Sequence, residues 1–214
     1  MTEKPRSSNH QTRRPRNAVA TRDAILQSAL AAFAHQGYDG VGVREIAQTA
    51  GVTAVLVNRY FGSKERLFAA AVEAMFAASS LFGGDASTLA QRLAALVVTK
   101  CGKDAHPSDP LLLLLRSAPN PRAAEILRDN IARHCERPLK SFMRGRKRAE
   151  RAAIVLALIV GLQLFHKVIG NKALAEANCT SLSGDLQLML ERLIDTSACL
   201  ESPLRRRHAR EPNH

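Results

Sequence analysis

Apolar residues recur three and four positions apart through most of this chain, which is the spacing of amphipathic helices. Sustained alternation of β-branched and polar residues, the pattern of a half-buried strand, does not occur. Ala and Leu, which favour helix, dominate the apolar positions. The pattern therefore predicts an all-α fold of about nine helices, near residues 21–36, 43–50, 54–60, 64–81, 87–101, 111–117, 122–145, 150–169 and 182–199.

The two short helices near residues 43–50 and 54–60 form the most informative stretch. Gly51 follows the first helix in the position where a left-handed residue ends a helix at no steric cost. Thr53 can cap the second helix through its hydroxyl. Two helices joined by a glycine-containing turn are a helix-turn-helix, whose second helix fits the major groove of DNA. We expect Val52, Val57 and Phe61 to point inward and the polar side chains to point outward.

The next helix begins after a serine, Ser63, that can cap it, and ends before the pair Gly83-Gly84. At 1.5 Å per residue it is about 27 Å long. Its apolar residues lie on one face, which predicts burial of Leu67, Phe68, Ala71, Val72, Met75 and Phe76. Farther along the chain, Pro138 lies within the helix near 122–145 and should kink or divide it.

The helix near residues 150–169 is apolar on every side rather than on one. Its apolar stretch, residues 152–165, is shorter than the roughly 20 residues that a membrane-spanning helix needs. An all-apolar helix in a protein outside the membrane must be covered on all sides. A second copy of the chain would cover it, whereas the basic run just before it would also suit a membrane surface.

The net charge of +12 is concentrated in three runs, residues 1–20, 140–151 and 201–214. Such basic runs imply a polyanionic partner, and flexible ones add salt-dependent affinity that is independent of base sequence. We expect residues 1–20 to be disordered in the free protein and to contact DNA through Arg13, Arg14 and Arg16. The alternative is that the basic runs serve only solubility.

The four cysteines, Cys101, Cys135, Cys179 and Cys199, show no metal-binding spacing. They are best interpreted as free thiols in a reducing cytoplasm, with a redox sensor as the alternative. The basic N-terminus lacks the apolar segment of a signal peptide. Paired carboxylates, a nucleophile–base set and metal-ligand spacing are also lacking, so we expect no enzyme activity, cofactor or metal.

The residues around the helix-turn-helix closely resemble the DNA-binding end of the TetR family of bacterial transcription regulators. The matching motifs stand in order and at the family's spacing over about 50 residues. They are Gly37-Tyr38, Val43-Arg44-Glu45-Ile46-Ala47, Ala50-Gly51-Val52-Thr53, Tyr60-Phe61, and Ser63-Lys64-Glu65 with Leu67-Phe68.

This resemblance implies four segments: a disordered basic arm at 1–20, a DNA-binding domain at 21–66, a ligand-binding and dimerisation domain at 67–200, and a basic tail at 201–214. From its position early in the first helix of the helix-turn-helix, we expect Arg44 to contact the DNA backbone. The residues expected to face the groove, from the second helix, are Thr53, Ala54, Asn58 and Arg59. Asn can pair with adenine and Arg with guanine. The resemblance adds Tyr60 and Lys64 as phosphate contacts. The alternative is that Tyr60 packs under the next helix and that Arg59 is merely solvated.

An effector pocket is also implied, and we expect it to be mainly aliphatic and suited to a hydrophobic ligand. Its candidate residues are Phe76, Leu93, Val97, Leu113, Arg116, Phe142, Gln163 and His166. Gln163 and His166 lie three residues apart on one helix and can face one cavity. They can equally be hydrogen-bonded at a dimer contact, and Arg116 can make a surface or capping bond.

The resemblance implies a cytoplasmic, nucleoid-associated homodimer that binds an operator in double-stranded DNA. Its helices near 150–169 and 182–199 would form the dimer interface. The function implied is a ligand-responsive regulator, a repressor that a small effector releases from DNA. The competing interpretation is a basic helical protein that associates with membrane surfaces.

Overall fold

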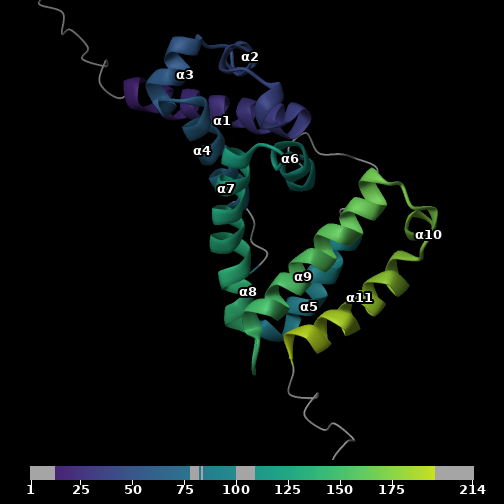
Figure 1. Ribbon diagram of the computed structural model, residues 1–214. Helices are drawn as coiled ribbons and strands as arrows, with labels where there is room; N and C mark the ends of the chain where they lie inside the picture. The colour runs from purple at the N-terminus through teal and green to yellow at the C-terminus, as the bar shows by residue number, and fades with distance from the viewer. Residues whose placement is uncertain (1–12, 78–81, 83, 100–108, 196–214) are drawn as a thin grey trace, which may run out of the picture. The chain divides into compact units, whose positions relative to one another are not determined.

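The computed structural model of the chain describes residues 13–77, 82, 84–99 and 109–195 (Figure 1). Within these ranges the chain is helical and contains no strand, which confirms the predicted all-α class. Contacts group the chain into two compact units. Unit 1 is Met1–Ser79 with Ala105–Asn130, and unit 2 is Ser80–Asp104 with Ile131–His214.

Unit 1 contains α1 (Arg13–Gly40), α2 (Val43–Thr49), α3 (Ala54–Phe61), α4 (Lys64–Ala77), α6 (Pro110–Ser117) and α7 (Pro121–Ile131). One apolar core joins all six helices. Phe33 of α1, Ile46 of α2 and Phe68 of α4 are fully buried in it. Leu113 of α6 and Ala123 of α7 are buried in the same core, so α6 and α7 share a core with the helix-turn-helix, and α6 packs against α1.

The predicted helix-turn-helix is confirmed in detail. Gly51 adopts a left-handed φ of +69° in the turn between α2 and α3. The Thr53 hydroxyl accepts a hydrogen bond from the Leu56 amide at 3.3 Å, so Thr53 is the cap of α3. Ser63 likewise accepts from the Arg66 amide at 3.1 Å at the start of α4. Both caps stabilise the helix ends by satisfying amide groups that have no partner within the helix.

Helix α1 begins at Arg13, so residues 13–20 are helical where the sequence predicted part of a disordered arm. Pro15 lies in the first turn, where its missing N–H has no helical partner to lose. Ala18 and Ala20 favour helix and carry it into the apolar stripe that begins at Ile25. Residues 1–12 lie outside the described part of the chain.

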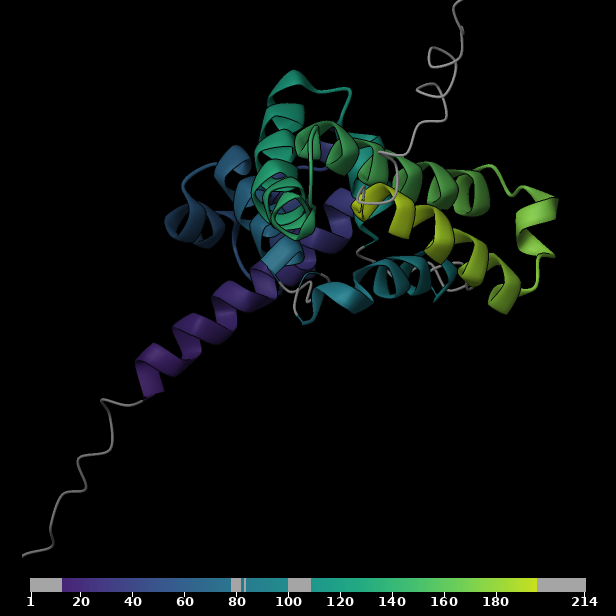
Figure 2. The ribbon, with the colours of Figure 1, turned by 90° about the horizontal axis from the view of Figure 1, so that it is seen from below.

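Unit 2 contains η1 (Ala86–Thr88), α5 (Leu89–Thr99), η2 (Ala132–Glu136), α8 (Arg137–Phe142), α9 (Arg148–Gln163), η3 (Leu164–Val168), α10 (Lys172–Ala175) and α11 (Cys179–Ile194). Helices α5, α9 and α11 lie side by side in both views (Figure 1, Figure 2). Leu93 of α5, Val155 of α9 and Leu190 of α11 are buried in their common core.

The long helix predicted near 122–145 is divided, as Pro138 led us to expect. The division takes the form of a π turn, η2, immediately before α8, in which Pro138 occupies the first turn. The wider turn removes the clash that a proline ring makes with the carbonyl four residues earlier in a regular helix. A second π turn, η3, ends the helix predicted near 150–169.

One arginine, Arg151, is buried near the start of α9. Its Nη1 donates to the carbonyl oxygens of Leu193 at 3.0 Å and Ile194 at 3.4 Å, and its Nη2 donates to the carbonyl of Arg144. These carbonyls lie at the C-terminal end of α11 and in the loop before α9. Arg151 therefore satisfies the helix end and holds the loop in place.

Replacing Arg151 with Met should lower the free energy of unfolding by about 2–3 kcal/mol, because buried carbonyls would lose a charged donor. Urea denaturation followed by circular dichroism measures this loss. Arg148→Met, at an exposed position in the first turn of the same helix, is the control and should change stability by less than about 0.5 kcal/mol. Equal midpoints for the two variants would contradict the role of Arg151.

Candidate nucleic-acid interface

The outer face of α3 is polar at the positions that the sequence predicted. Thr53, Asn58 and Arg59 are exposed, while Val57 and Phe61 point inward and are buried. Ala54 is half-buried and packs against the core of unit 1. The helix therefore presents a hydroxyl, an amide and a guanidinium to solvent, groups that can hydrogen-bond to base edges.

Tyr60 is half-buried and packs against the core, with its ring centroid 6.5 Å from that of Phe61. This position agrees with the alternative in which Tyr60 packs beneath the following helix. The Arg22 guanidinium of α1 lies 5.2 Å from the centre of the Phe61 ring. Periodicity did not single out Arg22, because only the folded arrangement brings its part of α1 to the end of α3.

The N-terminus of α4 lies beside an aromatic cluster. The rings of Phe33, Tyr38 and Phe68 pack together, and the Phe68 ring is edge-on to both of the others at 5.0 Å. The Lys64 ammonium lies 4.7 Å from the centre of the Tyr38 ring. This cation–π contact places the Lys64 charge next to the first turn of α4, where the helix dipole also favours an anion.

The remaining predicted DNA contacts fall at two other helix starts. Arg44 is exposed in the first turn of α2, whose N-cap, Gly42, has no side chain to satisfy the free amides. The backbones of Arg13, Arg14 and Arg16 lie in the first turn of α1, and their side chains lie outside the described part of the structure. Exposed side chains around the helix-turn-helix can therefore contact both bases and phosphates.

The residues predicted to line an effector pocket fall in both units. In unit 1, Leu113 is buried in the core and the Arg116 Nη1 donates to the Ala34 carbonyl at 2.6 Å, which is the capping alternative for Arg116. Phe76 is half-buried against the same core. In unit 2, Leu93 is buried and Phe142 half-buried in the second core.

Two of the predicted ligand residues, Val97 and His166, do line one recess in unit 2. Leu162, Leu174 and Leu182 complete it, and it leaves no space for a water molecule. The Nδ1 of His166 is buried and has no hydrogen-bond partner within the described residues. Gln163, also buried, is not one of the residues around this recess. The structure thus presents a small, mainly aliphatic recess with one histidine among its lining residues.

Cys135 is half-buried. Burial, and secondarily the nearby charge of Glu136, raises its pKa to about 11. At neutral pH the thiol is therefore protonated and unreactive, which argues against a redox role for Cys135. Cys179 is exposed, and Cys101 and Cys199 lie outside the described residues. Among the described residues no group of His, Cys, Asp and Glu side chains could hold a metal ion.

Two family models match this chain. One, described as bacterial regulatory proteins of the tetR family, matches residues 25–71. The other, described as the tetracyclin repressor-like C-terminal domain, matches residues 87–194. The first covers α2 and α3 with their neighbours, and the second covers α5 to α11.

Similar proteins include the HTH-type transcriptional regulator BetI of Rhizobium meliloti, 43% identical over 54 residues, which are 25% of this chain and 27% of BetI. The HTH-type transcriptional repressor NicS of Pseudomonas putida is 36% identical over 64 residues, 30% of each chain. The match thus spans less than a third of either relative. The crystal structure of E. coli NemR in its reduced form has a TM-score of 0.63 at 18% identity, over 83% of this chain and 98% of NemR, and shares the fold.

Alkylation of the native protein at pH 7 should modify Cys179 much faster than Cys135. The exposed thiol can react, whereas the raised pKa of Cys135 leaves less than about one part in a thousand as thiolate at that pH. Mass spectrometry of iodoacetamide-labelled peptides gives both rates in one experiment. Unfolding in urea is the control, because it should make the two rates similar. Comparable rates in the native protein would contradict the burial of Cys135.

Proposed function

This chain belongs to the TetR family of bacterial regulatory proteins, and from that premise we propose that it is a DNA-binding transcription regulator. The observation that carries the proposal is the outer face of α3, where Thr53, Asn58 and Arg59 are exposed on a rigidly capped helix. In a helix-turn-helix this face enters the major groove. Asn58 would pair with adenine and Arg59 with guanine, while Thr53 and Ala54 contact the neighbouring bases.

Phosphate contacts would fix the register of α3 in the groove. Lys64, held beside the N-terminus of α4, and Arg44, in the first turn of α2, are placed at helix ends that favour anions. Tyr60 can add its hydroxyl from the end of α3. Arg13, Arg14 and Arg16 would extend the contact along the backbone and carry no base specificity.

We further propose that the protein is a repressor that a small hydrophobic effector releases from DNA. The recess around Val97 and His166 supports this class of ligand, since its other lining residues are leucines. His166, whose buried Nδ1 has no hydrogen-bond partner within the described residues, would offer one hydrogen bond to a ligand once the recess opens. Because the recess has no room for a water molecule, a ligand would bind a more open state and so shift the population towards it.

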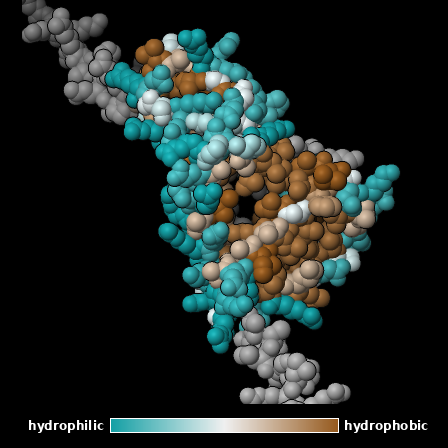
Figure 3. Space-filling view, in the orientation of Figure 1, coloured by the Kyte–Doolittle hydropathy of each residue, from teal (hydrophilic) through white to brown (hydrophobic). Residues whose placement is uncertain are grey.

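The partner that covers α9 and α11 would be a second copy of the chain. Large apolar side chains are exposed on these helices and the adjoining turn: Ile154, Val160, Phe165, Val168, Ile169, Leu188 and Met189. Figure 3 shows apolar side chains gathered over this part of the surface. Two copies would also place two recognition helices at successive major grooves, about 34 Å apart.

A membrane-surface function remains the competing proposal, because of one stretch in unit 2. Residues Arg148–Val168 are long and apolar enough to cross a membrane by length and composition, and 28% of that window is buried. Charged residues stand near both ends, including Arg151, which is buried and bonded within unit 2. Cover by a second copy accounts for the same apolar surface without removing α9 from its core, and we favour it.

Gel mobility shift with DNA flanking the protein's own gene tests the main proposal. Specific retention over random competitor DNA at moderate salt is expected. Lys64→Ala should weaken binding to every duplex alike and reduce the slope of log affinity against log salt by about 0.9, because one phosphate contact is lost. Lys172→Ala, a change of the same charge in unit 2, is the control. An unchanged slope would refute the Lys64 contact.

Leu188→Asp should shift the protein from dimer to monomer, because it places a charge in the proposed interface of α11. Leu188 is 62% exposed in the single chain, and Val19 on α1 has the same exposure. Val19→Asp is therefore the matched control and should leave the dimer intact. Sedimentation equilibrium measures the mass of both variants. A wild-type monomer that pellets with anionic vesicles would favour the membrane proposal instead.

A further inference from the structure

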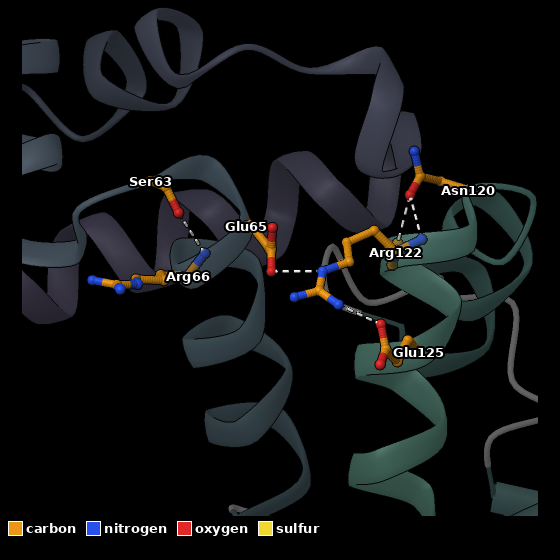
Figure 4. Close-up of polar contacts among 7 residues, drawn as sticks. Ser63, Glu65, Arg66, Asn120, Arg122 and Glu125 are labelled. Carbon is orange, nitrogen blue, oxygen red and sulfur yellow. Dashed lines mark hydrogen bonds and ion pairs between the residues drawn. The ribbon is translucent and has the colours of Figure 1, made fainter.

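The start of α7 carries an arginine that reaches the start of α4. The Arg122 Nε lies 2.8 Å from a carboxylate oxygen of Glu65, and its Nη1 lies 2.5 Å from one of Glu125 (Figure 4). Glu65 stands in the first turn of α4, directly after Lys64. One guanidinium thus joins a carboxylate of its own helix to a carboxylate at the N-terminus of another.

The position of Arg122 is fixed through its backbone. The side-chain oxygen of Asn120 accepts from the amides of Arg122 and Ala123, both at 3.0 Å, and so caps α7. The amide nitrogen of Asn120 donates to Asp39 at the end of α1, at 2.9 Å. Ala123 is fully buried in the core of unit 1. The first turn of α7 is therefore bound to α1 and the core, and it presents the Arg122 side chain from a defined place.

Glu65 has two opposite electrostatic effects at its position. In the first turn of α4 its negative charge interacts favourably with the positive end of the helix dipole and so stabilises the helix. The same charge repels a phosphate that approaches Lys64 and the helix N-terminus, where an anion would otherwise be favoured. An adjacent cation that neutralises Glu65 removes the repulsion and retains the helix contact. Arg122 is placed to supply that cation.

We infer that Arg122 is a positioning residue for the phosphate contact at the α4 N-terminus: by pairing with Glu65 it lets a DNA phosphate approach Lys64. This inference rests on the proposed DNA-binding function. It assigns α7, which follows the helix-turn-helix by some 60 residues, a part in the affinity for DNA. The contribution is electrostatic and independent of base sequence, so it weakens as salt is raised.

The charges around Tyr38 agree with this arrangement. Burial raises the pKa of the Tyr38 hydroxyl, the negative charges of Glu65 and Asp39 raise it further, and Arg122 partly offsets them. The Lys64 ammonium lies over the ring of the same tyrosine. Glu65 and Arg122 thus both act on the Tyr38 hydroxyl, and the Lys64 ammonium lies over the ring of that side chain.

The test is a double-mutant cycle on the full-length protein, with binding to a duplex from the DNA flanking its gene. Arg122→Ala should weaken binding about threefold at roughly 0.1 M salt, and the loss should shrink as salt rises. Glu65→Gln should restore most of the binding in the Arg122→Ala background, because it removes the carboxylate next to Lys64; Glu125, the other partner of Arg122, stays charged on α7. Arg122→Lys should retain most of the affinity. Arg128→Ala, at an exposed position of the same helix, removes the same charge and is the control.

Thermal unfolding of each variant separates this role from a structural one. If Arg122 only holds α7 against α4, Glu65→Gln cannot rescue Arg122→Ala in DNA binding, and that result overturns the inference. Equal binding by Arg122→Ala and Arg128→Ala overturns it as well. Wild-type protein that binds no duplex specifically contradicts the proposed function itself, whereas specific wild-type binding with no effect at Arg122 contradicts only this inference.

Discussion

The positions of α3 and α4 depend on the close approach of the end of α1 to α6. Gly37 adopts a φ of +78° there, and a Cβ at this position would lie 2.4 Å from the carbonyl oxygen of Arg116. Only glycine tolerates both the conformation and the contact. The approach lets the Arg116 side chain reach the Ala34 carbonyl and the Asn120 side chain reach Asp39. Through these bonds α6 and α7 complete the core on which α3 and α4 are positioned.

The sequence predicted those parts of the fold that local signals determine. The sequence predicts Thr53 and Ser63 as caps because each places a hydroxyl just before a run of apolar residues at helical spacing. Both hydroxyls accept the expected amide hydrogen bonds. The division before Pro138 followed from the chemistry of proline alone. The exposure of Asn58 and Arg59 followed from the same periodicity that buried Val57. For the helix-turn-helix, the residue pattern therefore contained nearly the whole geometry.

The remaining features depend on contacts between distant parts of the chain. Nothing in the local pattern pairs Arg122 with Glu65, or buries Arg151 against the carbonyls at the end of α11. Residues 13–20 have a composition typical of disorder, although they belong to α1. The four-residue helix α10 is too short to show a helical period in the sequence. Charged side chains are usually expected in solvent. Their buried or paired positions become evident only when the packing that surrounds them is known.

The energetics of base recognition favour more than one α3. Contacts to phosphates add affinity for any duplex, so discrimination between sequences would be left to the few side chains proposed to contact bases, such as Asn58 and Arg59. A good bidentate contact discriminates by about 1–3 kcal/mol, and two of them give at most about 6 kcal/mol. Specific regulators exceed their own non-specific binding by about 4–10 kcal/mol. One copy therefore reaches only the lower part of that range, whereas a second copy doubles the contacts within one operator and covers all of it. The apolar residues exposed on α9 and α11 supply a surface that can hold the two copies together. The requirement for specificity at α3 and the uncovered apolar surface of unit 2 therefore both favour a dimer of this chain.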